Sequence, residues 1–481
     1  MKDSKLISIL RSLNTRERSR FREYVNSPFF NKHEALTILF DYILKSAPHF
    51  EDKTLDKKDA FEIIFSKDKY SEQRIYTLLS NLLELMNGYL AQLHFEEKIL
   101  EQKCFTMAEL RKRNELKQWQ TVKKQYLILR DKNQFRGDEQ EAYFQFFKES
   151  DALFIAQQMR QYDENLQLKS DSLDCFYITE KLKAACDMYS RNIVIKADYK
   201  SWELSGLLEA IEKDWGRFSK IHSIEVYFGI LKMLVSGLEK DYREVKVLLK
   251  KHLGNFKQEE TKVQFDYVIN YIIRHLNSGR PDWYMEFLDL HRFLLDNEIL
   301  MMDGILPEWD YKNIVTVALR ADELNWAEEF IRNYREKLPE FVRDNAFNYN
   351  LAAFYFAAKD YKMALQLLQQ VNFTDESYQL GLKIIQLKSY YELGEWETGI
   401  SLISAFRQLV ERSKSLSEYR KLSNLNMLKL AKKIISLSQD WDFLTDSAQR
   451  KGIENLEEAL KKYQPQANLD WLMEKIEALK N

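Results

Sequence analysis

The stretches AAKDYKMALQLLQQV (357–371) and ELGEWETGISLISAF (392–406) are near copies of each other and decide the fold. Each has an aromatic residue in a short turn, followed by apolar or small residues at offsets 0, 3, 4 and 7. These are Ala364, Leu367, Leu368 and Val371 in the first stretch, and Gly399, Leu402, Ile403 and Phe406 in the second. The shift is 399 − 364 = 35 residues. Because such offsets share one helix face, a repeat of this length predicts a solenoid of stacked helix pairs.

Three earlier segments follow the same turn-plus-helix pattern. Tyr242 precedes Val245, Leu248, Leu249 and His252; Tyr284 precedes Phe287, Leu290, His291 and Leu294; Leu324 precedes Ala327, Phe330, Ile331 and Tyr334. The shifts between first positions are 287 − 245 = 42, 327 − 287 = 40 and 364 − 327 = 37. Drifting shifts predict irregular repeats with loop insertions, in an elongated and curved array.

Composition agrees with a folded, all-helical chain. The chain has 481 residues, of which 45% are hydrophobic and 30% charged, with only 13 glycines and 6 prolines. Sheet proteins need more turn residues than this. A net charge of −2 provides no global attraction for nucleic acid or an anionic membrane. Three widely spaced cysteines and the lack of a long apolar run or a signal peptide favour the cytoplasm and no membrane partner.

Changes in rhythm along the chain predict four segments. Residues 1–96 form an N-terminal helical domain, and 97–219 form irregular helical pairs with turns near Gly137 and Ser170. Repeats occupy 220–412. Residues 413–481 form C-terminal helices that end in an amphipathic helix. That helix has Leu469, Leu472 and Ile476 on one face, as the cap of a repeat array requires.

The best copies resemble the tetratricopeptide repeat (TPR) family over about 310–412. Matching positions are Val315, Ala327 and Pro339 in one copy; Leu351, Ala352, Tyr355, Tyr361, Ala364 and Leu368 in the next; and Tyr390, Gly394 and Trp396 in the last. Gly399 replaces the usual alanine, and Asn348 and Lys383 replace the usual tryptophan, as in divergent members. The resemblance implies an all-α fold, with a right-handed TPR-like superhelix following the N-terminal domain.

The resemblance also implies a partner-binding concave face built from the first helix of each pair. Its groove-facing positions would be Trp309, Lys312, Thr316 and Arg320; then Tyr349, Ala353 and Phe356; then Ile384, Lys388 and Tyr391. Mixed aromatics and cations suit an extended protein segment with apolar and acidic side chains. The family's clamp for a C-terminal carboxylate is not reproduced, because Thr316 stands where an asparagine is needed. A plainer interpretation is that these aromatics only fill space between repeats.

Catalytic and metal-binding patterns are missing from the sequence. It contains no P-loop, GxGxxG or HExxH motif, and no two of its seven histidines have the spacing of a helical zinc site. His252 and His291 fall on the apolar stripe and are expected to be packed side chains. Cys104, Cys175 and Cys186 are expected to be buried thiols. We therefore expect a non-enzymatic interaction protein without cofactor or metal.

One compact basic cluster supports an alternative. The segment RERSRFR contains Arg16, Arg18, Arg20 and Arg22, which split between two sides of a helix. A solvated surface is the plainer interpretation, and contact with nucleic acid is the functional one. The second hypothesis is then a transcription-related regulator, whose N-terminal helices touch DNA while the solenoid senses a partner. Its weakness is that the helical stretch 70–86 offers only Arg74 as a basic recognition residue.

Overall fold

The computed structural model describes residues 1, 3–50, 55–66, 68–132, 140–157, 161–195, 198–200, 204–372, 375–413 and 416–480. Within these residues the chain is helical and contains no β-strand, only an isolated bridge between Met302 and Ile305. The prediction of an all-α chain is therefore confirmed. The chain divides into two compact units, Met1–Glu180 and Lys181–Asn481.

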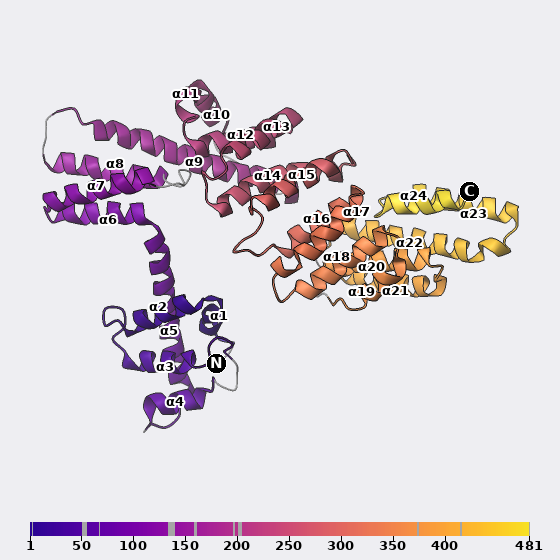
Figure 1. The fold of residues 1–481 in the computed structure, drawn as a ribbon, viewed down its shortest axis with the longest axis horizontal. Helices are drawn as coiled ribbons and strands as arrows, with labels where there is room; N and C mark the ends of the chain where they lie inside the picture. Colours follow the sequence, from indigo (N-terminus) through magenta and orange to yellow (C-terminus); the bar gives the residue numbers. More distant parts are fainter. Residues whose placement is uncertain are drawn as a thin grey trace. The chain divides into compact units, whose positions relative to one another are not determined.

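The helices of the first unit are, in order, α1 (Lys5–Ser12), α2 (Thr15–Asn26), α3 (Glu34–Leu44), α4 (Lys57–Phe65), α5 (Glu72–Glu97), α6 (Ile99–Lys112), α7 (Leu116–Lys132) and α8 (Gln140–Ala156). Helix α9 (Glu164–Ile195) contains the boundary between the units (Figure 1). The predicted segment 97–219 is thus shared between them. The turn predicted near Ser170 is wrong, because this segment lies inside α9, where the hydroxyl of Ser172 donates to the carbonyl of Leu168 instead of capping a turn. The turn predicted near Gly137 lies outside the described residues.

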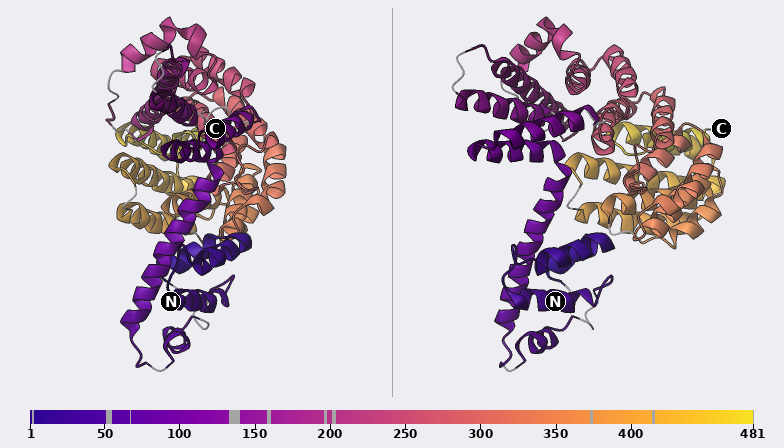
Figure 2. Two further views of the ribbon diagram at one scale, coloured as in Figure 1. Left: turned by 90° about the vertical axis from the view of Figure 1, so that its left-hand side faces the viewer. Right: turned by 60° about the vertical axis from the view of Figure 1, so that its left-hand side comes forward.

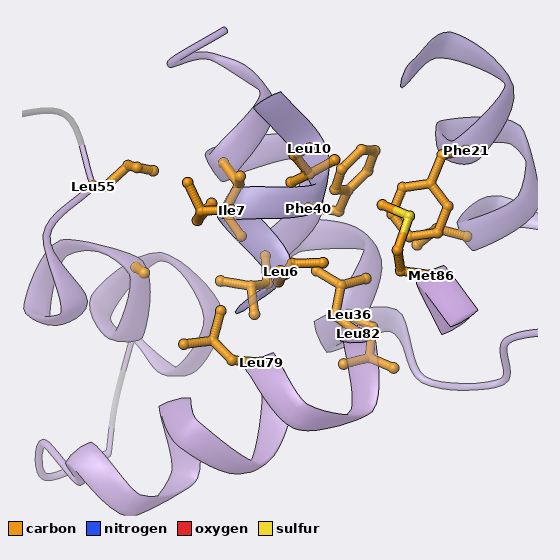
Figure 3. Close-up of a cluster of buried hydrophobic side chains, with 14 of the residues drawn as sticks. Leu6, Ile7, Leu10, Phe21, Leu36, Phe40, Leu55, Leu79, Leu82 and Met86 are labelled. Carbon is orange, nitrogen blue, oxygen red and sulfur yellow. The ribbon is translucent and has the colours of Figure 1, made fainter. Parts of the chain in front are cut away.

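Helices α1–α5 enclose a core of their own. Ser4 caps α1, and Asn14 with Glu17 forms a capping box at the start of α2, so polar side chains satisfy the first free amides of both helices. The apolar faces then meet in one buried cluster; Figure 3 labels Leu6, Ile7, Leu10, Phe21, Leu36, Phe40, Leu55, Leu79, Leu82 and Met86. A separate cluster around Trp119 and Tyr126 joins α6, α7 and α8. The buried residues of the α1–α5 core run from Leu6 to Tyr89, while the compact unit that contains it extends to Glu180.

The second unit contains, after the end of α9, α10 (Leu204–Lys213), α11 (Trp215–Phe218), α12 (His222–Ser236), α13 (Glu239–Lys251), α14 (Gln258–Asn277), α15 (Trp283–Asp296), α16 (Glu308–Arg320), α17 (Leu324–Asn333), η2 (Arg335–Lys337), α18 (Arg343–Ala357), α19 (Tyr361–Leu368), α20 (Glu376–Glu392), α21 (Trp396–Arg412), α22 (Glu418–Asp440), η3 (Trp441–Phe443), α23 (Asp446–Lys462) and α24 (Leu469–Ala478). Consecutive helices pack as neighbouring pairs, and first helices touch across pairs, as α16 touches α18 and α18 touches α20. Figures 1 and 2 show this succession from α12 to α22.

A left-handed residue marks the turn inside each of five successive pairs. The residues are Gly237 (φ 63°), Gly279 (φ 82°), Asp322 (φ 61°), Lys359 (φ 65°) and Gly394 (φ 71°). The last two spacings, 359 − 322 = 37 and 394 − 359 = 35, equal the shifts between the apolar stripes. The stripes themselves lie on the second helices α13, α15, α17, α19 and α21, with Ala364 and Phe406 fully buried. The predicted turn-plus-helix repeat is therefore present in the backbone.

Candidate functional site

The predicted groove residues lie on the first helices of three successive pairs, α16, α18 and α20. We call their shared side, which bears Trp309, Arg320, Phe356 and Lys388, the first-helix surface. Ring contacts join its members across helices: the Trp309 and Tyr378 rings are 4.9 Å apart, and the Tyr349 and Tyr378 rings are 5.1 Å apart. Tyr378 of α20 thus contacts Trp309 of α16 and Tyr349 of α18.

Lys312 lies among three aromatic rings at the start of this surface. Its Nζ is 4.0 Å from the ring centre of Tyr378, 4.9 Å from that of Trp309 and 5.4 Å from that of Tyr349. Burial lowers the pKa of Lys312, an effect that the nearby carboxylates of Asp375 and Glu308 oppose. The ammonium group is therefore held inside the protein by cation–π attraction. The main role of Lys312 is therefore to stabilise the packing of these rings, rather than to form an ion pair with a partner.

Tyr349 belongs to the packing of the repeat rather than to its open side. Its side chain is only 6% exposed, and it packs in one cluster with Ala352, Leu368 and Tyr378. Gly381 on α20 makes this possible, because a Cβ there would lie 2.2 Å from the Tyr349 hydroxyl. For Tyr349, the structure supports the interpretation that the aromatics fill space between repeats.

Among the aromatic residues predicted to face the groove, Trp309 is the most exposed to solvent. It is 41% exposed at the second position of α16, while one side of its indole contacts Tyr378 and Lys312. Because these two contacts already hold the indole in place, it has little conformational freedom to lose on binding. Trp309 therefore has the properties of a preorganised contact residue.

An acidic group lies beside Trp309. Burial raises the pKa of Glu308, and the negative charge of Asp375 raises it further. The Oε2 atom of Glu308 is buried and accepts no hydrogen bond from the described residues. A buried carboxylate oxygen without a donor is unfavourable, which agrees with the raised pKa of Glu308.

The other end of the surface is covered by the chain itself. Lys388 donates to Asn468 Oδ1 at 2.9 Å and lies 5.6 Å from the ring of Trp471 on α24. Tyr391 packs edge-on against Trp471, with ring centres 5.6 Å apart, and its hydroxyl is 3.1 Å from that of Ser438. Helix α24 thus packs on α22 and α23, and its side chains also contact α20. Lys388 and Tyr391, predicted to face the groove, are occupied by intramolecular contacts.

The remaining predicted positions differ in exposure. Thr316 and Arg320 are exposed on α16, and one Arg320 nitrogen is 3.5 Å from the hydroxyl of Tyr284. Ala353, Phe356 and Ile384 are half-buried. Phe356 leans on Tyr361, with ring centres 5.5 Å apart. The accessible portion of the predicted site therefore consists of Trp309, Thr316, Arg320 and part of Phe356.

Sequence reasoning did not find Tyr378, Glu308 or the role of Trp471. Tyr378 is the third residue of α20 and Trp309 is the second residue of α16, so an aromatic at the start of these two helices was an available signal. Contact between α24 and α20 has no such signal. It joins residues 80 positions apart, as in the Lys388–Asn468 hydrogen bond.

The basic cluster of α2 is bound within its own domain. Arg20 pairs with Glu96 at 2.6 Å, Arg22 with Asp41 at 2.8 Å, and Arg18 donates to the carbonyl of Leu10. Arg16 is exposed. Arg74, the other candidate for nucleic-acid contact, pairs with Asp68 at 2.6 Å. These ion pairs favour the interpretation of a solvated helix surface.

The histidines and cysteines pack as expected. His291 is buried and its Nδ1–H donates to the Phe287 carbonyl. His252 is buried between Glu225, 2.7 Å from its Nε2, and Asn255, 2.9 Å from its Nδ1. Cys104, Cys175 and Cys186 are buried free thiols. Among the described residues, no three His, Cys, Asp or Glu side chains gather in a way that could hold a metal ion.

Comparisons of the chain with protein-family models, with curated proteins and with solved structures gave no significant match. Within the described parts of the chain, no helix combines the length and apolar character that crossing a membrane requires.

Proposed function

We propose that this chain is a non-enzymatic, TPR-like adaptor of the cytoplasm that binds a segment of a partner protein on its first-helix surface. The repeated helix pairs support this proposal, because stacked pairs present an extended surface instead of enclosing a catalytic pocket. The three buried free thiols support a reducing compartment.

The observation that carries the proposal is Trp309. Tryptophan is enriched among residues whose truncation costs most in protein interfaces. Here an indole that is 41% exposed rests on Tyr378 and Lys312. The open side of this ring is therefore available to a side chain of a partner.

The neighbours of Trp309 define the chemistry of the bound segment. An apolar side chain would pack on the indole of Trp309. At the other end of α16, exposed Arg320 favours an acidic group. Trp309 and Arg320 are 11 positions apart along the helix, which corresponds to about 17 Å. An extended segment of about five or six residues covers this length.

A substitution at Trp309 tests the proposal. The tagged full-length chain and its Trp309→Ala variant are used to capture partners from the native host, with capture quantified by mass spectrometry. We expect one partner to be lost from the variant, because truncation of an anchoring tryptophan commonly costs about 2 kcal/mol or more in binding. Thermal melting should change little, because part of the ring is already in water.

Trp215→Ala is the matched control. Trp215 is 37% exposed and packs on one aromatic ring, that of Phe228, at 5.1 Å. It lies in the same unit but outside the first-helix surface. Equal capture by the parent chain and both variants would contradict the proposal, as would a large loss of stability in Trp309→Ala.

A further inference from the structure

A groove lies between α22 and α23, on elements that the proposed site does not use. Its floor is apolar: Leu456 of α23 is buried, and Leu437 of α22 packs beside it. Gly452 permits the two helices to approach, because a Cβ there would lie 2.7 Å from Leu437 Cδ1. Tyr463, just after α23, completes the lining.

One rim of this groove is cationic. Lys429, Lys432 and Lys433 are exposed on α22 and all line the groove. Their offsets of 3 and 4 place the three ammonium groups within about one helical turn. None of them forms an ion pair with the described residues, although Lys429 lies 5.4 Å from the ring of Tyr463.

Several exposed cations elsewhere on helices have a carboxylate at an offset of 4, as in Arg243–Glu239, Arg332–Glu328 and Arg407–Glu411. Like charges at such offsets destabilise a helix, whereas these opposite-charge pairs stabilise it. Asp440 is the carboxylate that lines the groove with the three lysines, so the groove has an excess of positive charge in a chain of net charge −2.

We propose that the α22–α23 groove is a second docking site, which takes an acidic amphipathic segment of a protein partner. Apolar side chains of the segment would cover Leu437 and Leu456, and its carboxylates would meet the lysine rim. Charge complementarity selects this occupant. The apolar floor argues against nucleic acid, whose phosphate backbone is bound by cationic and hydrogen-bonding groups.

The test uses the full-length chain and a fluorescein-labelled amphipathic peptide of Leu and Glu, long enough for about three helical turns. Fluorescence anisotropy measures its binding. We expect the double variant Lys432→Glu/Lys433→Glu to weaken binding by about tenfold or more, and added salt to weaken binding to the parent chain. A peptide with Lys in place of Glu, and another with Ser in place of Leu, should each bind more weakly.

The control variant is Lys117→Glu/Lys124→Glu. It makes the same change in net charge at two exposed positions of α7, and should bind the peptide like the parent chain. Because all four lysines are exposed, both double variants should melt near the parent temperature.

Four outcomes would overturn the proposal. They are equal binding by the two double variants, no peptide binding up to about 1 mM, tighter binding of single-stranded oligothymidine at the same lysines, and self-association of the chain that the Lys432→Glu/Lys433→Glu variant abolishes. The third would assign the groove to nucleic acid and the fourth to a second copy of the chain.

Discussion

Gly399 and Gly381 lie in the two helices of one pair, yet they leave very different space for a methyl group. A Cβ at Gly399 would be 3.4 Å from Ile435 Cδ1, an ordinary contact. A Cβ at Gly381 would be 2.2 Å from the hydroxyl of buried Tyr349. At the residue scale, Gly399 can be replaced by alanine, whereas Gly381 is required by the close approach of α18 and α20.

We expect Gly399→Ala to raise the free energy of unfolding by about 0.5–1 kcal/mol, because glycine inside a helix is less favourable than alanine by this amount. Gly381→Ala should lower it by about 1–3 kcal/mol through overpacking. Urea denaturation of both variants measures the difference. Equal effects of the two substitutions would contradict the assigned packing of Tyr349.

The free energy of unfolding should also depend on pH, because of the buried imidazole of His291. Burial lowers the pKa of this imidazole to about 4, against an ordinary value of 6.5. Between these values the unfolded chain binds more protons than the folded chain, so stability is full above about pH 6.5 and falls as the pH drops toward 4. The contribution amounts to about 3 kcal/mol.

His291→Phe removes this titration while keeping a ring against Phe287. Comparing the slopes of unfolding free energy against pH between 5 and 6.5 isolates His291 from other groups. We expect a shallower slope for the variant. Identical slopes would show that the imidazole takes up no proton on unfolding in this range.

At the scale of elements, the repeat is more regular in its backbone conformation than in its residue types. The turns at Gly237, Gly279, Asp322, Lys359 and Gly394 share a left-handed residue, although only three of the five are glycine. This conformation costs an L-residue with a side chain about 1–2 kcal/mol, whereas glycine adopts it freely. Packing of the paired helices therefore maintains the turn where the local residue opposes it.

We expect Lys359→Gly to stabilise the chain by about 0.5–1 kcal/mol and Gly394→Ala to destabilise it by about 1–2 kcal/mol. Steric crowding does not explain the destabilisation expected for Gly394→Ala, because the nearest atom to a Cβ at Gly394 is 3.8 Å away, in Trp396. Chemical denaturation measures both changes. Stabilisation by Gly394→Ala would rule out strain as the cause.

At the scale of the whole molecule, separate cores predict separate responses to mutation. Leu82 is buried in the cluster of α1–α5, and Leu430 is buried in the cluster of the C-terminal helices. Each Leu→Ala substitution should cost about 2–5 kcal/mol. Leu82→Ala should speed amide hydrogen exchange in α1–α5 and not in α20–α24, and Leu430→Ala should do the reverse. Exchange that rises equally in both regions for either variant would contradict separate cores.

The sequence by itself determined the helical class, the five turn-plus-helix copies and the packed state of His291 and Ala364. These follow from local periodicity, since offsets of 3 and 4 define a helix face wherever the helix lies. Only the tertiary structure decided that Trp309 is open while Tyr349 is buried, that α24 covers Lys388 and Tyr391, and that the boundary between units falls inside α9. Periodicity states which side of a helix is apolar. Which neighbour covers that side depends on contacts between residues far apart in the chain.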